Sequence, residues 1–263
     1  MEILVCVKKV PDTSDAEVIL KPDRTGIKEE DLAFGINEWD NYAVEEAIRI
    51  KEAHGGKVTV ATIGASDSED VLRRCLAMGA DEAIMVDGAP FKGSDPYGIA
   101  RGLRGVVVKG SYDLVLAGAQ AGDDGYAVVG PVLAGYLGWS HATLVTSVTV
   151  EGAKIAVTRE LEGGLEERLR LPLPAVLTIQ TGINEPRYVS IMGIRKVRSK
   201  EIPLLDLAAV GLAAGEVGAN ANLLRELSLA VPAAGKEAEM IKGAPAEIAR
   251  RILDVIWERG GVA

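Results

Sequence analysis

Apolar runs alternate with amphipathic segments along the first half of the chain. The apolar runs are rich in β-branched residues, are bounded by Gly, Asp or Pro, and lie at 3–7, 58–63, 83–86 and 114–117. Continuous runs of this kind are typical of parallel strands that are covered on both faces. The segments between them have helical periodicity and lie at 41–53, 68–78 and 96–108. Strand alternating with helix predicts an α/β fold with a doubly wound, mostly parallel sheet. Ser66 followed by Glu69 further predicts a capping box before the second helix, which Gly79 should end.

The pattern changes beyond residue 142. Short strand-like segments joined by Gly-containing turns lie at 144–150, 154–159, 166–171 and 175–180. They predict a β-hairpin excursion, with the last segment returning to the sheet. Residues 208–222 are rich in Ala, Gly and Asn and predict an extended arm. The expected organisation is an α/β domain over 1–200, followed by a C-terminal arm and helix over 201–263.

The last helix should begin at Pro245 and end at 260–261. Ile248, Ile252 and Ile256 recur at four-residue spacing and form one apolar stripe. The stripe has to be buried against either the chain's own domain or a partner, and the pattern leaves both alternatives open.

Composition and charge exclude several classes of function. A net charge of −9 and a pI near 5.0 argue against nucleic acid or an anionic membrane as the main partner. No window approaches the length of a membrane span, so we expect a cytoplasmic protein without membrane insertion. Cys6 and Cys75 lie in apolar segments and are expected to be buried thiols in a reducing compartment. His54 and His141 lack partners at ligand spacing, so no metal site is predicted, and no catalytic nucleophile system is recognisable.

The most informative segment is 113–131, in which an apolar strand runs into a Gly-rich loop that opens a helix. A helix N-terminus offers free backbone N–H groups, and small side chains let a phosphate approach them. The loop has neither a P-loop ending nor a G-x-G-x-x-G motif. Asp123 and Asp124 should repel a phosphate, so we expect one of them to cap the helix instead.

Five blocks in register resemble a known family. They are 7–13 (Val-Lys-Lys-Val-Pro-Asp-Thr), 36–47 (Ile-Asn-Glu-Trp-Asp-Asn-Tyr-Ala-Val-Glu-Glu-Ala), 76–81 (Leu-Ala-Met-Gly-Ala-Asp), 120–125 (Gln-Ala-Gly-Asp-Asp-Gly) and 182–188 (Gly-Ile-Asn-Glu-Pro-Arg-Tyr). Over nearly the whole chain they resemble the β subunit of electron transfer flavoprotein. The resemblance implies an adenine-nucleotide-binding, HUP-like α/β domain that pairs with an α subunit carrying a second FAD. It implies an electron carrier rather than a self-sufficient enzyme, with no catalytic residue of its own.

The family's β subunit holds either AMP or, in the electron-bifurcating branch, FAD. Residues 10–13 and 129–131 are similar to the bifurcating and nitrogen-fixation-type branch, which favours FAD with AMP as the alternative. The cofactor-binding residues implied by the resemblance are Cys6, Val7, Lys8, Asn37, Trp39, Asp40, Ile63, Gly64, Gln120, Asp123, Asp124, Gly125, Tyr126, Ala127, Val128 and Val129. Among these, Asn37 could instead only cap the helix that follows it, and Trp39 could belong to the core.

The chain departs from the family where many members have Thr-x-Gln or Asn-Gln-Thr before the helix. It has Tyr126-Ala127-Val128-Val129, so the expected phosphate donors are the backbone N–H groups of Ala127 to Val129. Tyr126 either adds a hydroxyl group or simply packs.

Residues 184–200 combine apolar side chains with basic ones. In the family this loop docks dehydrogenases, and the resemblance implies Ile191 as the apolar anchor with Arg187, Arg195 and Lys196 around it. The implied partners are the α subunit and dehydrogenases such as acyl-CoA dehydrogenase. NADH joins them in a bifurcating complex, which alone would oxidise it. Two other functions are weighed: a universal-stress-type nucleotide-binding regulatory module, which leaves 183–263 unexplained, and an adenylating enzyme, for which the loop lacks a basic phosphate site.

Overall fold

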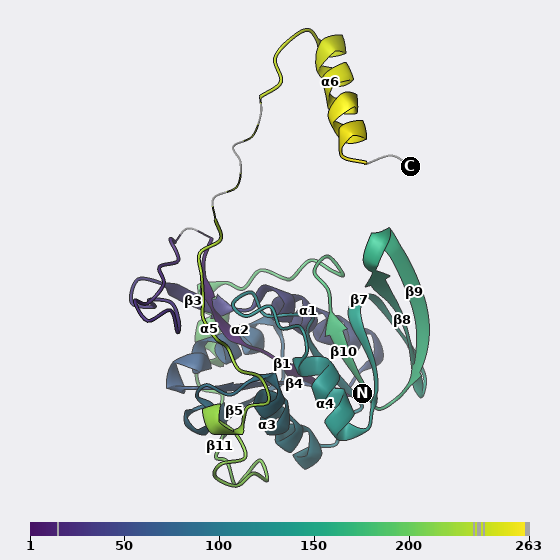
Figure 1. Ribbon diagram of the computed structural model, residues 1–263. Helices are drawn as coiled ribbons and strands as arrows, with labels where there is room; N and C mark the ends of the chain where they lie inside the picture. The colour runs from purple at the N-terminus through teal and green to yellow at the C-terminus, as the bar shows by residue number, and fades with distance from the viewer. Residues whose placement is uncertain (15, 234, 236–237, 239, 261–263) are drawn as a thin grey trace.

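A mostly parallel sheet forms the centre of the computed structural model, which describes all residues except 15, 234, 236–237, 239 and 261–263 (Figure 1). In this part of the chain the sheet has nine strands in the order β11-β5-β4-β1-β6-β10-β7-β8-β9. Their bounds are β1 Glu2–Cys6, β4 Lys57–Gly64, β5 Glu82–Asp87, β6 Leu114–Gly118, β7 Ser140–Glu151, β8 Lys154–Leu161, β9 Leu165–Pro172, β10 Ala175–Ile179 and β11 Leu204–Leu205. From β11 to β7 all neighbours pair in parallel, which confirms the predicted α/β fold.

Helices cover both faces of the sheet. They are α1 Glu38–His54, α2 Glu69–Met78, α3 Pro96–Lys109 and α4 Val129–Leu137. Alternate residues of β1 enter two separate cores: Ile3 and Val5 join α1 and α2, whereas Leu4 and Cys6 join α3 and α4. Burial on both faces explains why the parallel strands are continuous apolar runs. In the described part of the chain, no helix combines the length and the apolar character needed to cross a bilayer.

The order of the strands creates a switch point beside β1. The chain runs from β1 to β4 and β5 on one side, then returns to place β6 on the other side of β1. The connections after β1 and β6 therefore diverge at the carboxyl ends of these strands, where ligands bind in folds of this class. A small antiparallel pair, β2 Lys9–Asp12 and β3 Ala33–Ile36, follows β1 and leads into α1.

The ends of the helices agree only in part with the sequence prediction. Gly79 ends α2 with a φ of 132°, a conformation that suits glycine. The predicted capping box is wrong, because Ser66 lies in a 3₁₀ turn, Ser66–Ser68, that precedes α2. The residue before α2 is Ser68, and its side chain makes no capping hydrogen bond.

The predicted hairpin excursion is confirmed and extends the same sheet. The first half of β7 pairs in parallel with β10, and its second half pairs antiparallel with β8. β9 then pairs antiparallel with β8 and forms the edge. β10 returns to the centre between β6 and β7, as expected of the last segment.

The extended arm expected at 208–222 is wrong. β11 pairs with β5, and Val210 and Val217 are buried in the core on the α3 face. Gly105 of α3 allows this approach, since a Cβ atom there would overlap the carbonyl oxygen of Val210. The small residues of this segment therefore allow it to pack closely against the domain, and they do not form an extended arm.

The last helix, α6 Pro245–Glu258, stands clear of the α/β domain (Figure 1). None of its described side chains is buried, and Trp257 is 73% exposed. The predicted start at Pro245 is confirmed, and Gly260 with a φ of 70° follows the helix, while Gly261 lies outside the described residues. The apolar stripe of α6 is thus not covered by the described part of this chain.

Candidate functional site

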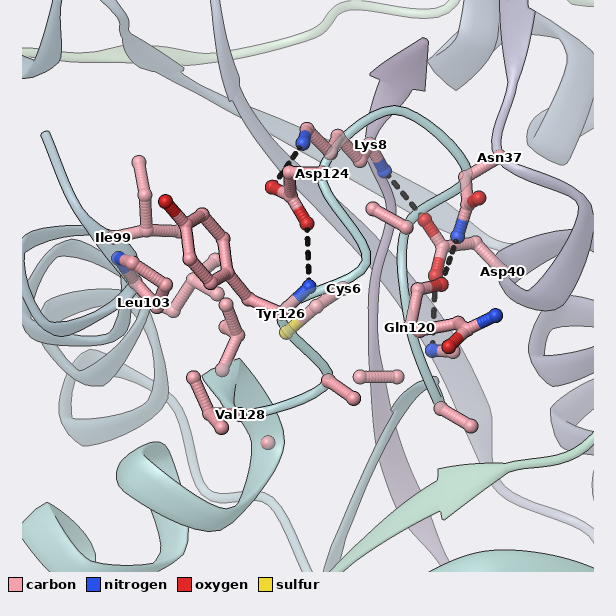
Figure 2. A pocket seen from close by; sticks show the side chains of 18 of the residues that line it. Cys6, Lys8, Asn37, Asp40, Ile99, Leu103, Gln120, Asp124, Tyr126 and Val128 are labelled. Carbon is pink, nitrogen blue, oxygen red and sulfur yellow. Dashed lines mark hydrogen bonds and ion pairs between the residues drawn. The ribbon is translucent and has the colours of Figure 1, made fainter. Parts of the chain in front are cut away.

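A cavity lies at the carboxyl ends of the central strands, between the loop after β1 and the Gly-rich loop before α4 (Figure 2). Of the residues predicted to bind a cofactor, those that line it are Cys6, Val7, Lys8, Asn37, Asp40, Ile63, Gln120, Asp124, Tyr126, Ala127, Val128 and Val129. The predicted residues outside the lining are Trp39, Gly64, Asp123 and Gly125. The indole N–H of Trp39 donates to Gln180 Oε1 at 3.0 Å.

The lining also includes residues that the sequence pattern did not identify. Ser94, Pro96, Ile99 and Leu103 come from the start of α3 and the loop before it. In Figure 2 the ring of Tyr126 lies on the same side of the cavity as Ile99 and Leu103. The order of the strands could have predicted this wall, because the loop after β5 ends at the same edge of the sheet as the loops after β1 and β6.

Asp40 joins the two strands that flank the cavity. Its carboxylate accepts the backbone N–H of Lys8 at 2.7 Å and that of Gly118 at 2.9 Å. A Cβ atom at residue 118 would overlap this carboxylate, so glycine is required there. The residue is only 5% exposed, and burial raises the pKa of Asp40 to about 7 despite these hydrogen bonds.

Asn37 holds the first part of the Gly-rich loop. Its Nδ2 donates to the carbonyl oxygen of Gln120 at 2.8 Å, and its Oδ1 accepts the N–H of Gly122 at 3.1 Å. Of the two alternatives for Asn37, the structure does not show the one in which it only caps α1, because its side chain makes no capping hydrogen bond. The side chain is buried. Instead of capping the helix next to it, it makes two hydrogen bonds to a segment more than 80 residues away in the sequence.

The two aspartates of the loop pair with Lys8 instead of capping the helix. Lys8 Nζ lies 2.7 Å from Asp123 and 2.8 Å from Asp124. The predicted cap is wrong, because α4 starts at Val129, several residues later, and no side chain caps it. Asp124 instead accepts the N–H of Tyr126 within the loop (Figure 2). Burial opposes the charge of Lys8, but the two carboxylates outweigh it and raise the pKa of this lysine.

The end of the loop lines the cavity and carries backbone N–H groups without acceptors among the described residues. Ala127 has a φ of 56°, which turns the backbone sharply before α4. Across the residues that the structure describes, the N–H groups of Ala127, Val128 and Val129 have no acceptor. These are the donors predicted from the sequence, and their surroundings are the side chains of Val128, Val129 and Tyr126 rather than basic groups.

Three of the four predicted docking residues, Ile191, Arg195 and Lys196, lie on a short helix far along the chain, α5 Ile191–Val197. Ser190 caps it by accepting the N–H of Gly193 at 3.1 Å. Ile191 is 72% exposed, and Met192 beside it is 68% exposed. Arg195 and Lys196 are exposed on the same helix. This places an apolar pair beside positive charge on the surface.

Arg187 differs from the other predicted docking residues, because its guanidinium is bound within the chain. It pairs with Glu45 at 2.8 Å and with Glu52 at 2.9 Å, both on α1. The two carboxylates raise the pKa of Arg187 above its ordinary value. Arg187 therefore anchors the loop that leads into α5.

The family model described as the electron transfer flavoprotein domain matches residues 25–210. The chain is 38% identical over 265 residues to the electron transfer flavoprotein subunit β of Methylophilus methylotrophus, covering 99% of this chain and 100% of that protein. The chain belongs to the electron transfer flavoprotein β-subunit family. The protein of the same description from Thermoanaerobacterium thermosaccharolyticum is 37% identical, with 98% of this chain and 99% of that one covered. The human protein is 39% identical over 81% of this chain and 84% of its own length.

The range matched by the family model includes most of the features described above. The matched range includes Asn37, Asp40, the Gly-rich loop and α5, whereas α6 lies beyond it. The two bacterial relatives extend over nearly all of the chain, so the C-terminal region falls within the compared length. The resemblance noted in the sequence is confirmed at the level of this family.

Proposed function

We propose that the chain is the β subunit of a heterodimeric electron transfer flavoprotein and that its cavity holds the adenylate half of FAD. It would pass electrons between a nicotinamide or an acyl-CoA dehydrogenase and an acceptor, together with an α subunit that carries a second FAD. Family membership supports the carrier role. The free, buried thiols of Cys6 and Cys75 support a reducing, cytoplasmic environment.

The observation that carries the proposal is the row of N–H groups at Ala127, Val128 and Val129, which belong to residues that line the cavity and have no acceptor among the described residues. Such groups at a helix start bind phosphate oxygens. Cys6, Val7 and Ile63 supply an apolar wall at the strand ends that suits an adenine ring. These residues fit an adenylate, and their part is to bind and orient it. When bound, FAD supplies the electron-transfer chemistry.

AMP in the same cavity is the alternative, in a carrier that does not bifurcate electrons. FAD is preferred because residues 10–13 and 129–131 resemble the bifurcating branch. A universal-stress-type regulatory module would use the cavity but not the exposed apolar pair of α5.

Residues of α5 are proposed to dock the dehydrogenase. Ile191 would be the apolar anchor, with Arg195 and Lys196 speeding encounter through their charge. Arg187 would position this loop on α1 rather than contact the partner.

The test is co-expression with an α-subunit homologue, followed by the visible spectrum and nucleotide analysis of the purified pair. Two flavins per pair support the bifurcating carrier, and one flavin with released AMP supports the alternative. A colourless chain that binds neither an α subunit nor a nucleotide would contradict both. NADH oxidation by the two-flavin pair would test the bifurcating role further.

A further inference from the structure

Beyond β11, the C-terminal segment follows α3 from its far end to its start (Figure 1). The backbone of Val210 lies against Gly105 at the far end. About one turn earlier in the helix, Nη1 of Arg101 donates to the carbonyl oxygen of Glu216 at 3.1 Å. Residues 218–224 then contact the loop before α3. The segment therefore supports the helix that forms one wall of the cavity.

Three consecutive residues before α3 are hydrogen-bonded to this segment. Asn222 accepts the N–H of Asp95 through Oδ1 and donates to the carbonyl oxygen of Gly93 through Nδ2, both at 2.8 Å. The N–H of Gly218 donates to Ser94 Oγ at 2.7 Å. The three residues belong to no helix or strand, so their bonds to the C-terminal segment fix the path of the loop.

Asp95 is at the centre of this contact. Its Oδ2 accepts the N–H groups of Leu223 at 2.6 Å and of Leu224 at 2.9 Å. Its Oδ1 caps α3 by accepting the N–H of Gly98 at 3.0 Å. Burial opposes the charge of this residue, but these backbone hydrogen bonds hold the pKa of Asp95 below its ordinary value. One ionised carboxylate therefore joins the start of α3 to the C-terminal segment.

The same loop forms part of the cavity wall. Ser94 and Pro96 line the cavity, whereas Asp95 between them is outside the lining and bonds to the C-terminal segment. Ser94 does both, since its hydroxyl group also accepts the N–H of Gly218. A movement of the C-terminal segment away from the loop would therefore release two residues of the wall.

We propose that Asp95 and Asn222 form a clamp that makes the C-terminal segment part of the nucleotide site. The closed clamp positions Ser94 and Pro96 beside the ligand, and a bound nucleotide in turn holds the clamp closed. Asp95 and Asn222 are positioning residues, because neither is in the cavity lining. The proposal rests on the proposed function, in which the cavity binds a nucleotide, and adds to it a link with the C-terminal segment.

The physical reason is the entropy of the loop before α3. When the clamp is open, a ligand has to order this part of the wall as it binds, and the cost reduces its affinity. The link is reciprocal: closing the clamp strengthens binding by the same factor by which the ligand suppresses opening. We expect a factor of about five, which corresponds to the net contribution of one hydrogen bond.

Hydrogen exchange of the unaltered full chain tests the clamp without any variant. The amides of Gly218, Leu223 and Leu224 should exchange about fivefold more slowly when AMP is saturating. Gly193 is the matched control, because its N–H also donates to a serine hydroxyl group, that of Ser190, outside the cavity lining. The exchange rate of Gly193 should not change.

Asn222→Ala weakens the clamp by removing two of its hydrogen bonds. AMP should bind this variant about fivefold more weakly in isothermal titration calorimetry. Asp206→Ala is the control, since Asp206 lies in the same C-terminal segment but its carboxylate accepts the N–H of Ala209, away from the clamp and the cavity lining. Circular dichroism checks that both variants are folded.

Two results would overturn the proposal while leaving the proposed function intact. One is that AMP slows exchange at Gly218, Leu223 and Leu224 no more than at Gly193, and the other is that Asn222→Ala binds AMP as tightly as the control variant. If the chain alone does not bind AMP, the exchange comparison is made on the αβ pair with and without its nucleotide. If neither the chain nor the pair holds a nucleotide, the proposed function itself fails.

Discussion

Arg187 and Glu45 form a two-point ion pair that joins the loop leading into α5 to the middle of α1. Nε and Nη2 of the arginine donate to the two carboxylate oxygens at 2.8 and 3.0 Å. The side chain of Glu45 is only 3% exposed, whereas that of Arg187 is 34% exposed. A buried carboxylate with one dominant partner is costly to leave alone, so this pair fixes where the loop leaves the domain.

Arg187→Met should therefore lower the free energy of unfolding by about 2 kcal/mol at pH 7, since it leaves Glu45 buried with only the exposed Arg49 as a cation partner. Although burial opposes it, Arg187 holds the pKa of Glu45 below its ordinary value of 4.5. Because the pKa of Glu45 is lowered in the native state, its ion pair stabilises the fold fully when the pH is above 4.5. This stabilisation is lost as the pH falls through the native pKa of Glu45. Urea unfolding should show the difference shrinking between pH 5 and pH 3. Arg251→Met, which removes an exposed pair on α6, is the control and should have little effect.

Asp40 should make stability depend on pH in the opposite direction. Its pKa is raised from 3.8 to about 7, so the native state retains the proton that the unfolded chain has lost. The stabilisation is present below about pH 4 and is lost as the pH rises through 7. We expect the stability advantage of the unaltered chain over Asp40→Asn to fall between pH 5 and pH 8, by an amount on the order of 1–4 kcal/mol. Urea unfolding at both pH values measures it, and an advantage that is constant with pH would contradict this role of Asp40.

Asn37→Ala should weaken nucleotide binding more than it weakens the fold. It removes both hydrogen bonds that hold residues 120–122 beside the cavity. The expected loss of AMP affinity is about tenfold, equivalent to about 1.4 kcal/mol, as is typical of removing one or two such bonds. Asn184→Ala is the matched control, since Asn184 also bonds to the chain, at Tyr42 and Glu46, away from the cavity lining. Equal affinities for AMP in the two variants would rule out the loop-holding role.

Ile191→Ala should slow electron transfer from a dehydrogenase while leaving the nucleotide content unchanged. Truncating an apolar anchor in an interface typically costs more than 1 kcal/mol, so kcat/KM should fall about fivefold or more, mainly through KM. Leu165→Ala is the control, because Leu165 is 64% exposed but lies in β9, away from α5. If both variants transfer electrons at the unaltered rate, α5 is not the docking site.

The strands and helices could be predicted because their signals are local. The apolar runs of β1, β4 and β6 and the periodicity of α1 depend only on neighbouring residues, and the edge of the sheet that carries the site follows from their order. The hydrogen-bond and ion-pair partners of polar side chains cannot be predicted from neighbouring residues in this way. Asn37 and Asp124 each have a plausible local cap within a few residues, yet the structure gives them partners 83–116 residues distant.

The C-terminal segment illustrates the same limit for packing. Ala-rich and Gly-rich composition carries no period that distinguishes an extended arm from a closely packed one. What decides between them is Gly105, which leaves room for the backbone of Val210, and this relationship becomes visible only in three dimensions.

Two truncations should separate the packed part of the C-terminal region from the part that stands clear. A chain ending at residue 224 keeps β11, the buried Val210 and Val217, and the N–H groups that Asp95 accepts. Its free energy of unfolding should equal that of the full chain, because no described residue after 224 is buried. A chain ending at residue 203 exposes the core on the α3 face and should lose about 3 kcal/mol or more, since burying one valine side chain contributes about 1.5–3 kcal/mol. Urea unfolding of the three chains measures this. Equal stability of the two truncated chains would show that residues 204–224 add nothing to the domain. A loss in the longer one would show that residues 225–263 stabilise the domain, in which the N–H of Leu229 donates to the carbonyl oxygen of Arg24 at 3.0 Å.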